Sequence, residues 1–219
     1  MERIPEPELM DDPEQALAYA RADFSEPHNF FIELIIQRFG ASLSGSVLDL
    51  GCGPGDICRR FAQRFPECRI HAVDASAAML DLARTDTGNP ALDSRILYIL
   101  AHLPEAQLPL KHYDMLISNS LLHHLENPAS LWKSIINYGR TGTMVFVMDL
   151  LRPEDRGQAG RLLGEYAGNE PEVLQKDFFN SLLAAYRPDE VRKQLAQYGL
   201  DRLQFEVVSD RHFIVYGFL

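Results

Sequence analysis

The chain is poor in cysteine, and this shortage limits the compartments and metal sites that suit it. Its 219 residues include three cysteines, at positions 52, 58 and 68. An odd number at these spacings forms neither a paired disulfide framework nor a Cys-x-x-Cys metal motif. We therefore expect a protein of the reducing cytoplasm.

Positive charge is also scarce. The sequence holds 21 Lys and Arg residues against 31 Asp and Glu residues, which gives a formal net charge of -10. Binding to nucleic-acid backbones requires clustered Lys and Arg, because those side chains release the condensed counterions. We therefore expect no nucleic-acid partner.

Long apolar runs and export signals are missing as well. Residues 1–8 are acidic and contain two prolines, whereas a signal peptide needs a basic region followed by an apolar one. Apolar runs such as Met144 to Met148 are far shorter than a bilayer span. The sequence predicts no export and no membrane insertion.

A glycine-rich stretch carries the strongest positive signal. Val47 to Leu50 has the pattern of a short strand that carries the carboxylate of Asp49, and glycines follow at 51, 53 and 55. Apolar residues then recur at helical spacing. Alternate glycines permit positive φ and let a ligand lie against the main chain, and the helix that follows presents unpaired N–H groups. The pattern predicts a nucleotide-like ligand.

The spacing of these glycines indicates which nucleotide. Dinucleotide-binding turns have the pattern G-x-G-x-x-G, but position 56 is Asp56 instead of glycine. A carboxylate there would repel a pyrophosphate at the helix N-terminus. Asp74 lies 19 residues after Gly55, at the end of the next apolar run, where it can accept both ribose hydroxyl protons. Ribose without pyrophosphate points to S-adenosylmethionine.

Three segments resemble the motifs of the class I S-adenosylmethionine-dependent methyltransferases. Residues 49–55 resemble the first motif, residues 73–76 the second and residues 114–125 the fourth. The resemblance covers residues 40 to 150 and implies these cofactor-binding residues: Asp49, Gly51, Cys52, Gly53 and Gly55 at the methionine end, Asp74, Ala75 and Ser76 at the ribose, Ala101, His102 and Leu103 at the adenine, and Asn119 and Ser120 near the sulfonium. Many relatives carry an acidic residue at the adenine position, and this chain does not.

Strand and helix patterns alternate after residue 46, which favours a parallel sheet covered on both faces. Strands are predicted at 46–50, 69–74, 95–100, 113–119, 143–149, 203–209 and 212–218, and helices at 56–65, 76–84, 128–138 and 188–198. We expect an α/β, Rossmann-like, seven-stranded, mostly parallel sheet with an antiparallel last strand, helices on both faces and a helical lid. Residues 1–219 would form one methyltransferase domain: a lid at 1–40 whose two helices start near Asp12 and Ser25, a cofactor-binding core at 41–150, a two-helix cap at 151–187, and a final helix and strand pair at 188–219.

The acceptor should lie beyond the carboxyl ends of the strands. His123 and His124 follow Asn119 there, and histidine is the natural base near neutral pH. The alternative is that the pair only starts a helix and packs. A metal role has little support, because adjacent helical residues point about 100° apart and no third ligand is evident. We expect no metal.

Aromatic and polar residues of the lid and the cap suit a small organic acceptor. The predicted pocket residues are Tyr19, Phe24, His28, Asp149, Tyr166 and Tyr186, and each could instead belong to the core. No Asn/Asp-Pro-Pro-Tyr pattern or Pro-Cys nucleophile indicates methylation of nucleic-acid bases. The nearest likeness is to the quinone-biosynthesis type.

The sequence therefore predicts an S-adenosylmethionine-dependent methyltransferase, monomeric or homodimeric, that acts on a small molecule. A non-catalytic cofactor-binding regulatory protein is a second possibility. An NAD-dependent oxidoreductase is a third, and Asp56 disfavours it.

Overall fold

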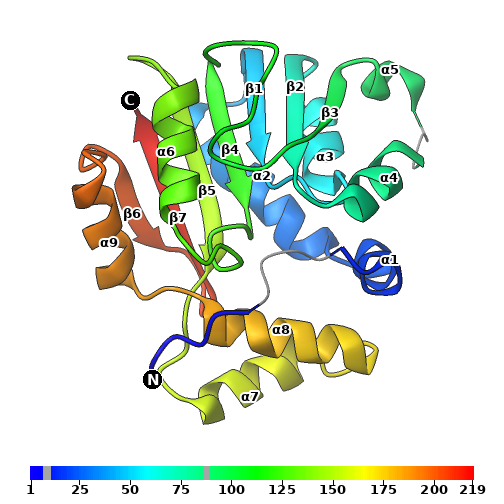
Figure 1. Ribbon diagram of the computed structural model, residues 1–219, viewed down its shortest axis with the longest axis vertical. Coiled ribbons are helices and arrows are strands. Elements are labelled where there is room, and N and C mark those ends of the chain that lie inside the picture. The colour runs from blue at the N-terminus through cyan, green and yellow to red at the C-terminus, as the bar shows by residue number, and fades with distance from the viewer. Residues whose placement is uncertain (7–10, 86–88) are drawn as a thin grey trace.

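The computed structural model describes residues 1–6, 11–85 and 89–219, and within them a seven-stranded sheet forms the centre (Figure 1). Its order is β3-β2-β1-β4-β5-β7-β6. The strands are β1 (Ser44–Leu50), β2 (Glu67–Asp74), β3 (Ile96–Leu100), β4 (Met115–Asn119), β5 (Met144–Leu150), β6 (Gln204–Val207) and β7 (His212–Phe218). All seven predicted strands are present, with boundaries that differ by two residues at most.

Strand direction follows from the connections. β1 pairs in parallel with β2 and β4, and the outer pairs β2 with β3 and β4 with β5 are parallel too. β7 runs antiparallel to both β5 and β6, because a tight turn joins it to β6. The expected mostly parallel sheet with an antiparallel last strand is confirmed.

Helices cover both faces of this sheet. They are α1 (Pro13–Arg21), α2 (Ser25–Phe39), α3 (Asp56–Arg64), α4 (Ala77–Thr85), α5 (Pro90–Asp93), α6 (Ala129–Tyr138), α7 (Arg156–Tyr166), α8 (Glu172–Ala184) and α9 (Pro188–Gln197). The sequence predicted all of these except α5, a single turn that begins at Pro90.

Two apolar cores separate the helices from the sheet. One holds Phe31 of α2, Phe61 of α3 and Phe146 of β5, and the other holds Trp132 of α6 and Val191 of α9. All five are fully buried. These cores fix the sheet between two helical layers and leave the ends of the strands to form a site.

The carboxyl ends of the parallel strands meet at the lower edge of the sheet in Figure 1, where α1, α7 and α8 lie. Gln15 of α1 donates to Asp177 of α8 over 2.9 Å and so joins the two segments. Residues 1–6 run beside α8, and the Ile4 N–H donates to the Leu183 carbonyl. Helices therefore cover the edge of the sheet at which the sequence predicts the site. No helix within the described residues is both long and apolar enough to cross a lipid bilayer.

Candidate functional site

The glycine loop after β1 adopts backbone conformations that favour glycine. Gly51 and Gly53 have φ of 77° and 51°. A Cβ on Gly51 would come within 3 Å of the Leu121 side chain, so the tight turn needs glycine there. A Cβ on Gly53 would meet nothing within 4 Å. The loop is therefore packed on one side and open on the other.

Asp74, at the end of β2, braces this loop. Its Oδ2 accepts the Gly53 N–H at 2.8 Å, and its Oδ1 accepts the Ser76 N–H at 2.8 Å. Burial raises the pKa of Asp74 above its ordinary value, although these backbone donors act in the opposite direction. Because a carboxylate has about four acceptor positions, Asp74 can also accept from a ligand.

Asp49, at the end of β1, is 1% exposed. The Cys58 thiol of α3 donates to its Oδ2 over 2.9 Å. Burial raises the pKa of Asp49 to about 7, although the thiol lowers it. A cation beside this carboxyl group would favour its ionised form.

Two adjoining cavities lie at this edge of the sheet. The first, of about 420 Å³, contains the glycine loop, Asp49 and Asp74 in its lining, and the second, of about 310 Å³, lies against α8. Eight residues line both: Tyr19, Ala22, Asp23, Phe24, His28, Asn119, Ser120 and His124. These shared residues mark the place where a group could pass from a molecule in one cavity to a molecule in the other.

Two shared residues at the end of β4 have unusual environments. The buried Oδ1 of Asn119 has no hydrogen-bond partner within the described part of the chain, and a buried acceptor of this kind calls for a donor. Ser120 has a φ of 55°, the one non-glycine residue with positive φ among the described residues. Such backbone conformations are costly and concentrate at functional sites.

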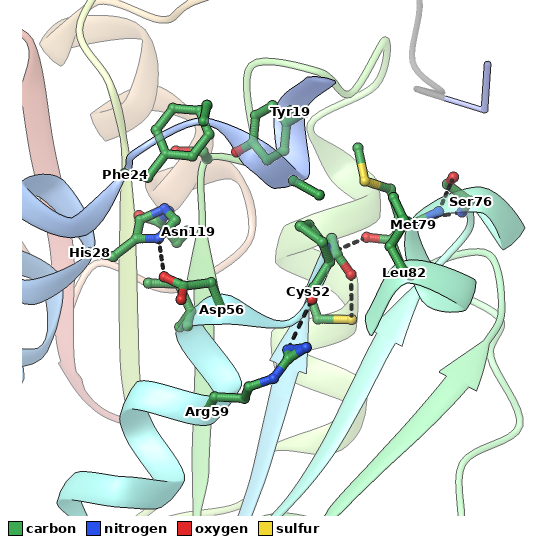
Figure 2. Close-up of a pocket in the computed structure, with 18 of the residues that line it drawn as sticks. Tyr19, Phe24, His28, Cys52, Asp56, Arg59, Ser76, Met79, Leu82 and Asn119 are labelled. Carbon is green, nitrogen blue, oxygen red and sulfur yellow. Dashed lines mark hydrogen bonds and ion pairs between the residues drawn. The ribbon is translucent and has the colours of Figure 1, made fainter. Parts of the chain in front are cut away.

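The N-terminal helices supply an aromatic roof. The Tyr19 and Phe24 rings lie 4.7 Å apart, and Figure 2 shows them across the cavity from Cys52 and Arg59. Burial, followed by the nearby carboxylates, raises the pKa of Tyr19 to about 12. The phenol therefore stays neutral and can act as a hydrogen-bond partner.

His28 and Asp56 form a dyad between the two helices α2 and α3. Nδ1 of His28 lies 2.5 Å from Oδ2 of Asp56, which also accepts Nε of Arg60 at 2.6 Å (Figure 2 draws the first contact). Burial alone would raise the pKa of Asp56, but the hydrogen bonds from His28 and Arg60 lower it to about 2. The Asp56 carboxylate is thus ionised and oriented.

His123 and His124 lie in a turn rather than at the start of a helix, since α6 begins at Ala129. The expectation that the pair starts a helix is wrong, whereas His123 does pack in the interior at 2% exposure. Nδ1 of His123 lies 2.6 Å from Oδ1 of Asp149, and Oδ2 of Asp149 accepts the Leu122 N–H. Burial alone would lower the pKa of His123, but Asp149 raises it above its ordinary value. The Asp149 pKa is lowered, since the pull of His123 outweighs burial. The two form a buried ion pair.

A third possible ligand accompanies the histidine pair. Nδ1 of His124 lies 3.1 Å from Oε1 of Glu6, and the donor atoms of His123, His124 and Glu6 lie within 4.8 Å of one another. We expected no third ligand because nothing in the sequence links residue 6 to residue 124. Tertiary folding brings Glu6 there, and the Ser181 hydroxyl donates to the same carboxylate.

The structure brings most of the predicted site residues together. The following line one or both cavities: Asp49, Gly51, Cys52, Gly53, Asp74, Ser76, Asn119, Ser120, Tyr19, Phe24, His28, Tyr166, His123 and His124. Asp149 and Tyr186, which we expected in the acceptor pocket, line neither cavity. The carboxylate of Asp149 contacts His123 instead. The ring of Tyr186 packs against the guanidinium of Arg3, whose Cζ lies 4.3 Å from the ring centroid.

The predicted adenine segment lies apart from both cavities. Ala101 and Leu103 pack against the core that contains Trp132, and His102 is exposed. Ala75 and Gly55 also line neither cavity. The Gly55 Cα faces protein, because a Cβ there would lie 2.5 Å from the Tyr98 hydroxyl.

Three contacts between residues of the site were not predicted from the sequence. Cys58 donates to Asp49, Asp56 orients His28, and Glu6 joins the histidine pair. The i,i+4 spacing of Asp56 and Arg60 could have shown that Asp56 is a paired carboxylate. No local signal could have found the other partners.

Comparison with solved structures defines the class of fold. A SAM dependent methyltransferase from Aquifex aeolicus superposes with a TM-score of 0.67 and 18% identity, over 94% of this chain and 97% of that one. The plantazolicin methyltransferase BpumL superposes with a TM-score of 0.69 and 14% identity, over 93% and 90%. At such identity the likeness shows the fold.

Sequence comparison adds the family. Residues 47–142 match the methyltransferase domain family. This segment of the chain, from β1 to the turn before β5, is therefore similar in sequence to methyltransferase domains.

Curated relatives share part of their length with this chain. The biotin biosynthesis bifunctional protein BioHC of Teredinibacter turnerae is 30% identical over 58% of this chain and 24% of its own length. An uncharacterized methyltransferase of Mycobacterium tuberculosis is 29% identical over 57% and 66%, and the trans-aconitate 2-methyltransferase of Mycobacterium ulcerans is 32% identical over 48% and 38%. The chain thus spans less than two thirds of these proteins.

Proposed function

We propose that the chain transfers a methyl group from S-adenosylmethionine to a small organic molecule. The observation that carries this proposal is the pair of adjoining cavities at the carboxyl edge of the sheet, with eight residues common to both. The match of residues 47–142 to the methyltransferase domain family supports the cofactor. Sequence relatives named for trans-aconitate and malonyl-[acyl-carrier protein] support an acceptor of this kind, and the plantazolicin methyltransferase shares the fold.

In this proposal the first cavity takes the cofactor. Asp49 and the loop with Gly51, Cys52 and Gly53 hold the methionine end, where the cationic ammonium group matches the carboxyl group of Asp49. Asp74 accepts from the ribose, next to Ser76. The buried Oδ1 of Asn119, which has no hydrogen-bond partner among the described residues, accepts a hydrogen bond from the cofactor.

The second cavity then takes the methyl acceptor. Tyr19, Phe24 and Tyr166 supply aromatic surface, and His28 and His124 lie on the wall common to both cavities. Methyl transfer requires an in-line approach of the acceptor atom to a methyl group that the sulfonium already activates. The roof formed by α1 and α8 orients the acceptor and excludes water.

In the same proposal each segment of the chain has a role. Residues 1–40 and 151–187 act as lid and cap over the core at 41–150, and the protein works as a monomer or homodimer. The net charge of -10 supports a small-molecule partner over a nucleic acid.

Two measurements separate this function from its rivals. Calorimetric titration with S-adenosylmethionine, S-adenosylhomocysteine and NAD should give heat of binding for the first two ligands alone, and binding of NAD alone would refute the proposal. Incubation of the protein with methyl-labelled S-adenosylmethionine and a metabolite extract should then yield a labelled product. Cofactor binding without any transfer would identify a regulatory binder instead.

A matched pair of variants tests whether binding and transfer depend on the first cavity. Asp74→Ala alters the carboxylate beside the glycine loop, whereas Asp81→Ala alters an exposed carboxylate of α4 that contacts Arg84. Loss of binding in the first variant and not in the second is the expected result. Equal behaviour of the two would contradict the placement of the cofactor.

A further inference from the structure

We propose that His28, held by Asp56, is the general base of the transfer, and that the acceptor therefore carries a proton at neutral pH, as a hydroxyl group does. This inference rests on the proposed function and assigns the proton transfer to a residue outside the histidine pair. It also narrows the acceptor to compounds that must lose a proton when they are methylated.

The position of His28 suits this role. The residue lies in the first turn of α2, is 8% exposed, and lines both cavities. Its ring lies 5.4 Å from the ring of Phe24, which limits its rotation. Figure 2 shows the imidazole between Phe24 and Asp56, beside Asn119. His28 thus lies on the wall past which the methyl group has to move.

Asp56 fixes the tautomer of the imidazole. The carboxylate lies 2.5 Å from Nδ1 and is itself held by Nε of Arg60 at 2.6 Å. Asp56 is also the first residue of α3, where the helix dipole favours negative charge. Nδ1 therefore carries the proton and donates it, so that Nε2 keeps its lone pair. No hydrogen bond to Nε2 occurs within residues 1–6, 11–85 and 89–219.

Charged and polar groups surround the part of the cavity wall that holds His28. Asp23 precedes α2 and Glu26 lies in it, as His28 does. The other groups are Asp56 and Arg60 of α3, Tyr19 of α1 and His124 of the turn after β4. Three of these are carboxylates, and the closest one is in direct contact. An imidazolium at His28 would be stabilised by Asp56 in the manner of a catalytic triad.

The histidine pair is less suited to accept a proton. Burial is outweighed by Asp149, so the pKa of His123 is raised and this ring already tends to be charged. The ring of His124 lies 4.1 Å from it. Nδ1 of His124 lies 3.1 Å from Oε1 of Glu6, so both rings already have a carboxylate partner from outside the proposed acceptor. His123 and His124 therefore suit the binding of the acceptor better than its deprotonation.

The need for a base sets the class of acceptor. A carboxylate is already ionised at neutral pH and would gain nothing from His28. The second cavity is also poorly suited to an anion, because its lining includes four carboxylates, Asp23, Glu26, Glu170 and Asp177, and one guanidinium, that of Arg211. Arg211 already contacts Asp210 and lies over the ring of Tyr166. A neutral hydroxyl group fits this environment.

The transfer exchanges a carbon–sulfur bond for a carbon–oxygen bond. The hydroxyl oxygen forms a bond to the methyl carbon while the bond from that carbon to sulfur breaks, and its electron pair stays on sulfur. The hydroxyl proton passes to Nε2 of His28, which becomes an imidazolium opposite Asp56. The products are a methyl ether and S-adenosylhomocysteine, and the imidazolium returns its proton to water.

His28→Gln tests the base. The glutamine amide can still donate to Asp56 but cannot take up a proton, so turnover at neutral pH should fall by about 10² to 10⁴. Affinity for S-adenosylhomocysteine should stay unchanged, and the acid limb of the pH profile should disappear. His112→Gln, at an exposed position outside both cavities, is the matched control and should behave like the wild type. Full turnover in His28→Gln would overturn the inference.

Two further measurements examine the tautomer and the acceptor. Nitrogen NMR of the complex with S-adenosylhomocysteine should show a proton on Nδ1 of His28 and a bare Nε2, and the opposite tautomer would refute the base. The label transferred to a metabolite extract should survive mild alkali, as an ether does. Its release as methanol would reveal a carboxylate ester and overturn the acceptor class. A wild-type protein that neither binds S-adenosylmethionine nor transfers label would instead refute the proposed function, and with it the base.

Discussion

Asp49 links cofactor binding to the uptake and release of a proton. Its carboxyl group is 1% exposed, accepts the Cys58 thiol at 2.9 Å and lines the first cavity. Burial raises its pKa from 3.8 to about 7, even though the thiol lowers it. The group is therefore largely protonated in the empty protein below neutral pH, and the ammonium of a bound cofactor would favour its ionised form.

The size of the effect follows from this pKa. At about pH 6 a group with this pKa is about 0.9 protonated and at about pH 8 it is about 0.1 protonated, so cofactor binding should release about 0.9 and 0.1 of a proton respectively. Calorimetric titration with S-adenosylhomocysteine measures this release when it is repeated in two buffers that differ in ionisation enthalpy.

Asp49→Asn provides the control. The amide oxygen can still accept the Cys58 thiol, but the side chain cannot ionise, so the release near pH 6 should vanish. Asp74→Asn should retain it, although the pKa of Asp74 is raised as well. Equal release in the wild type and in Asp49→Asn would refute the reasoning.

The same shift predicts how stability depends on pH. The folded-state pKa of Asp49, about 7, lies above the ordinary value of 3.8. The contribution of Asp49 to the stability of the fold is therefore complete below the ordinary pKa and is lost as the pH rises through the folded-state pKa. Denaturant unfolding of the wild type should therefore show a decline across this window that Asp49→Asn lacks. A decline of the same size in both proteins would assign it to other groups.

Three more predictions concern the site. Asp74→Ala should weaken binding of S-adenosylmethionine and S-adenosylhomocysteine alike, by at least about tenfold, and leave turnover at saturating cofactor comparatively intact. Asp74→Asn, which can still accept the Gly53 N–H, should lose less affinity, and unaltered affinity in both variants would count against the ribose assignment. His124→Ala should lower turnover more than cofactor affinity and less than His28→Gln does, and equal losses of turnover and affinity in His124→Ala would place it at the cofactor. In hydrogen exchange, residues 1–30 and 153–185 should gain protection when cofactor and acceptor bind, and unchanged protection in both segments would show that neither closes.

The fold could be derived from the sequence because its signals are local. Alternating strands and helices specify a parallel sheet, and the turn between β6 and β7 reverses the last strand. The glycine loop and Asp74 were also recognisable, because a turn with positive φ and an acidic residue at a strand end are encoded by neighbouring residues. These features position the proposed cofactor site.

The partners of the site residues were decided by tertiary structure alone. Asp56 illustrates this: the sequence shows a carboxylate that disfavours a pyrophosphate, and the fold places His28 of another helix 2.5 Å from it. In the same way Glu6 reaches His124, and Asp149 turns to His123 rather than to a cavity. Periodicity specifies which face of an element is buried, but the partner of a polar side chain depends on how distant elements pack. The sequence by itself therefore determined the scaffold and the glycine loop, and the packing of α1, α2 and α8 over the strand ends determined which histidine faces both cavities.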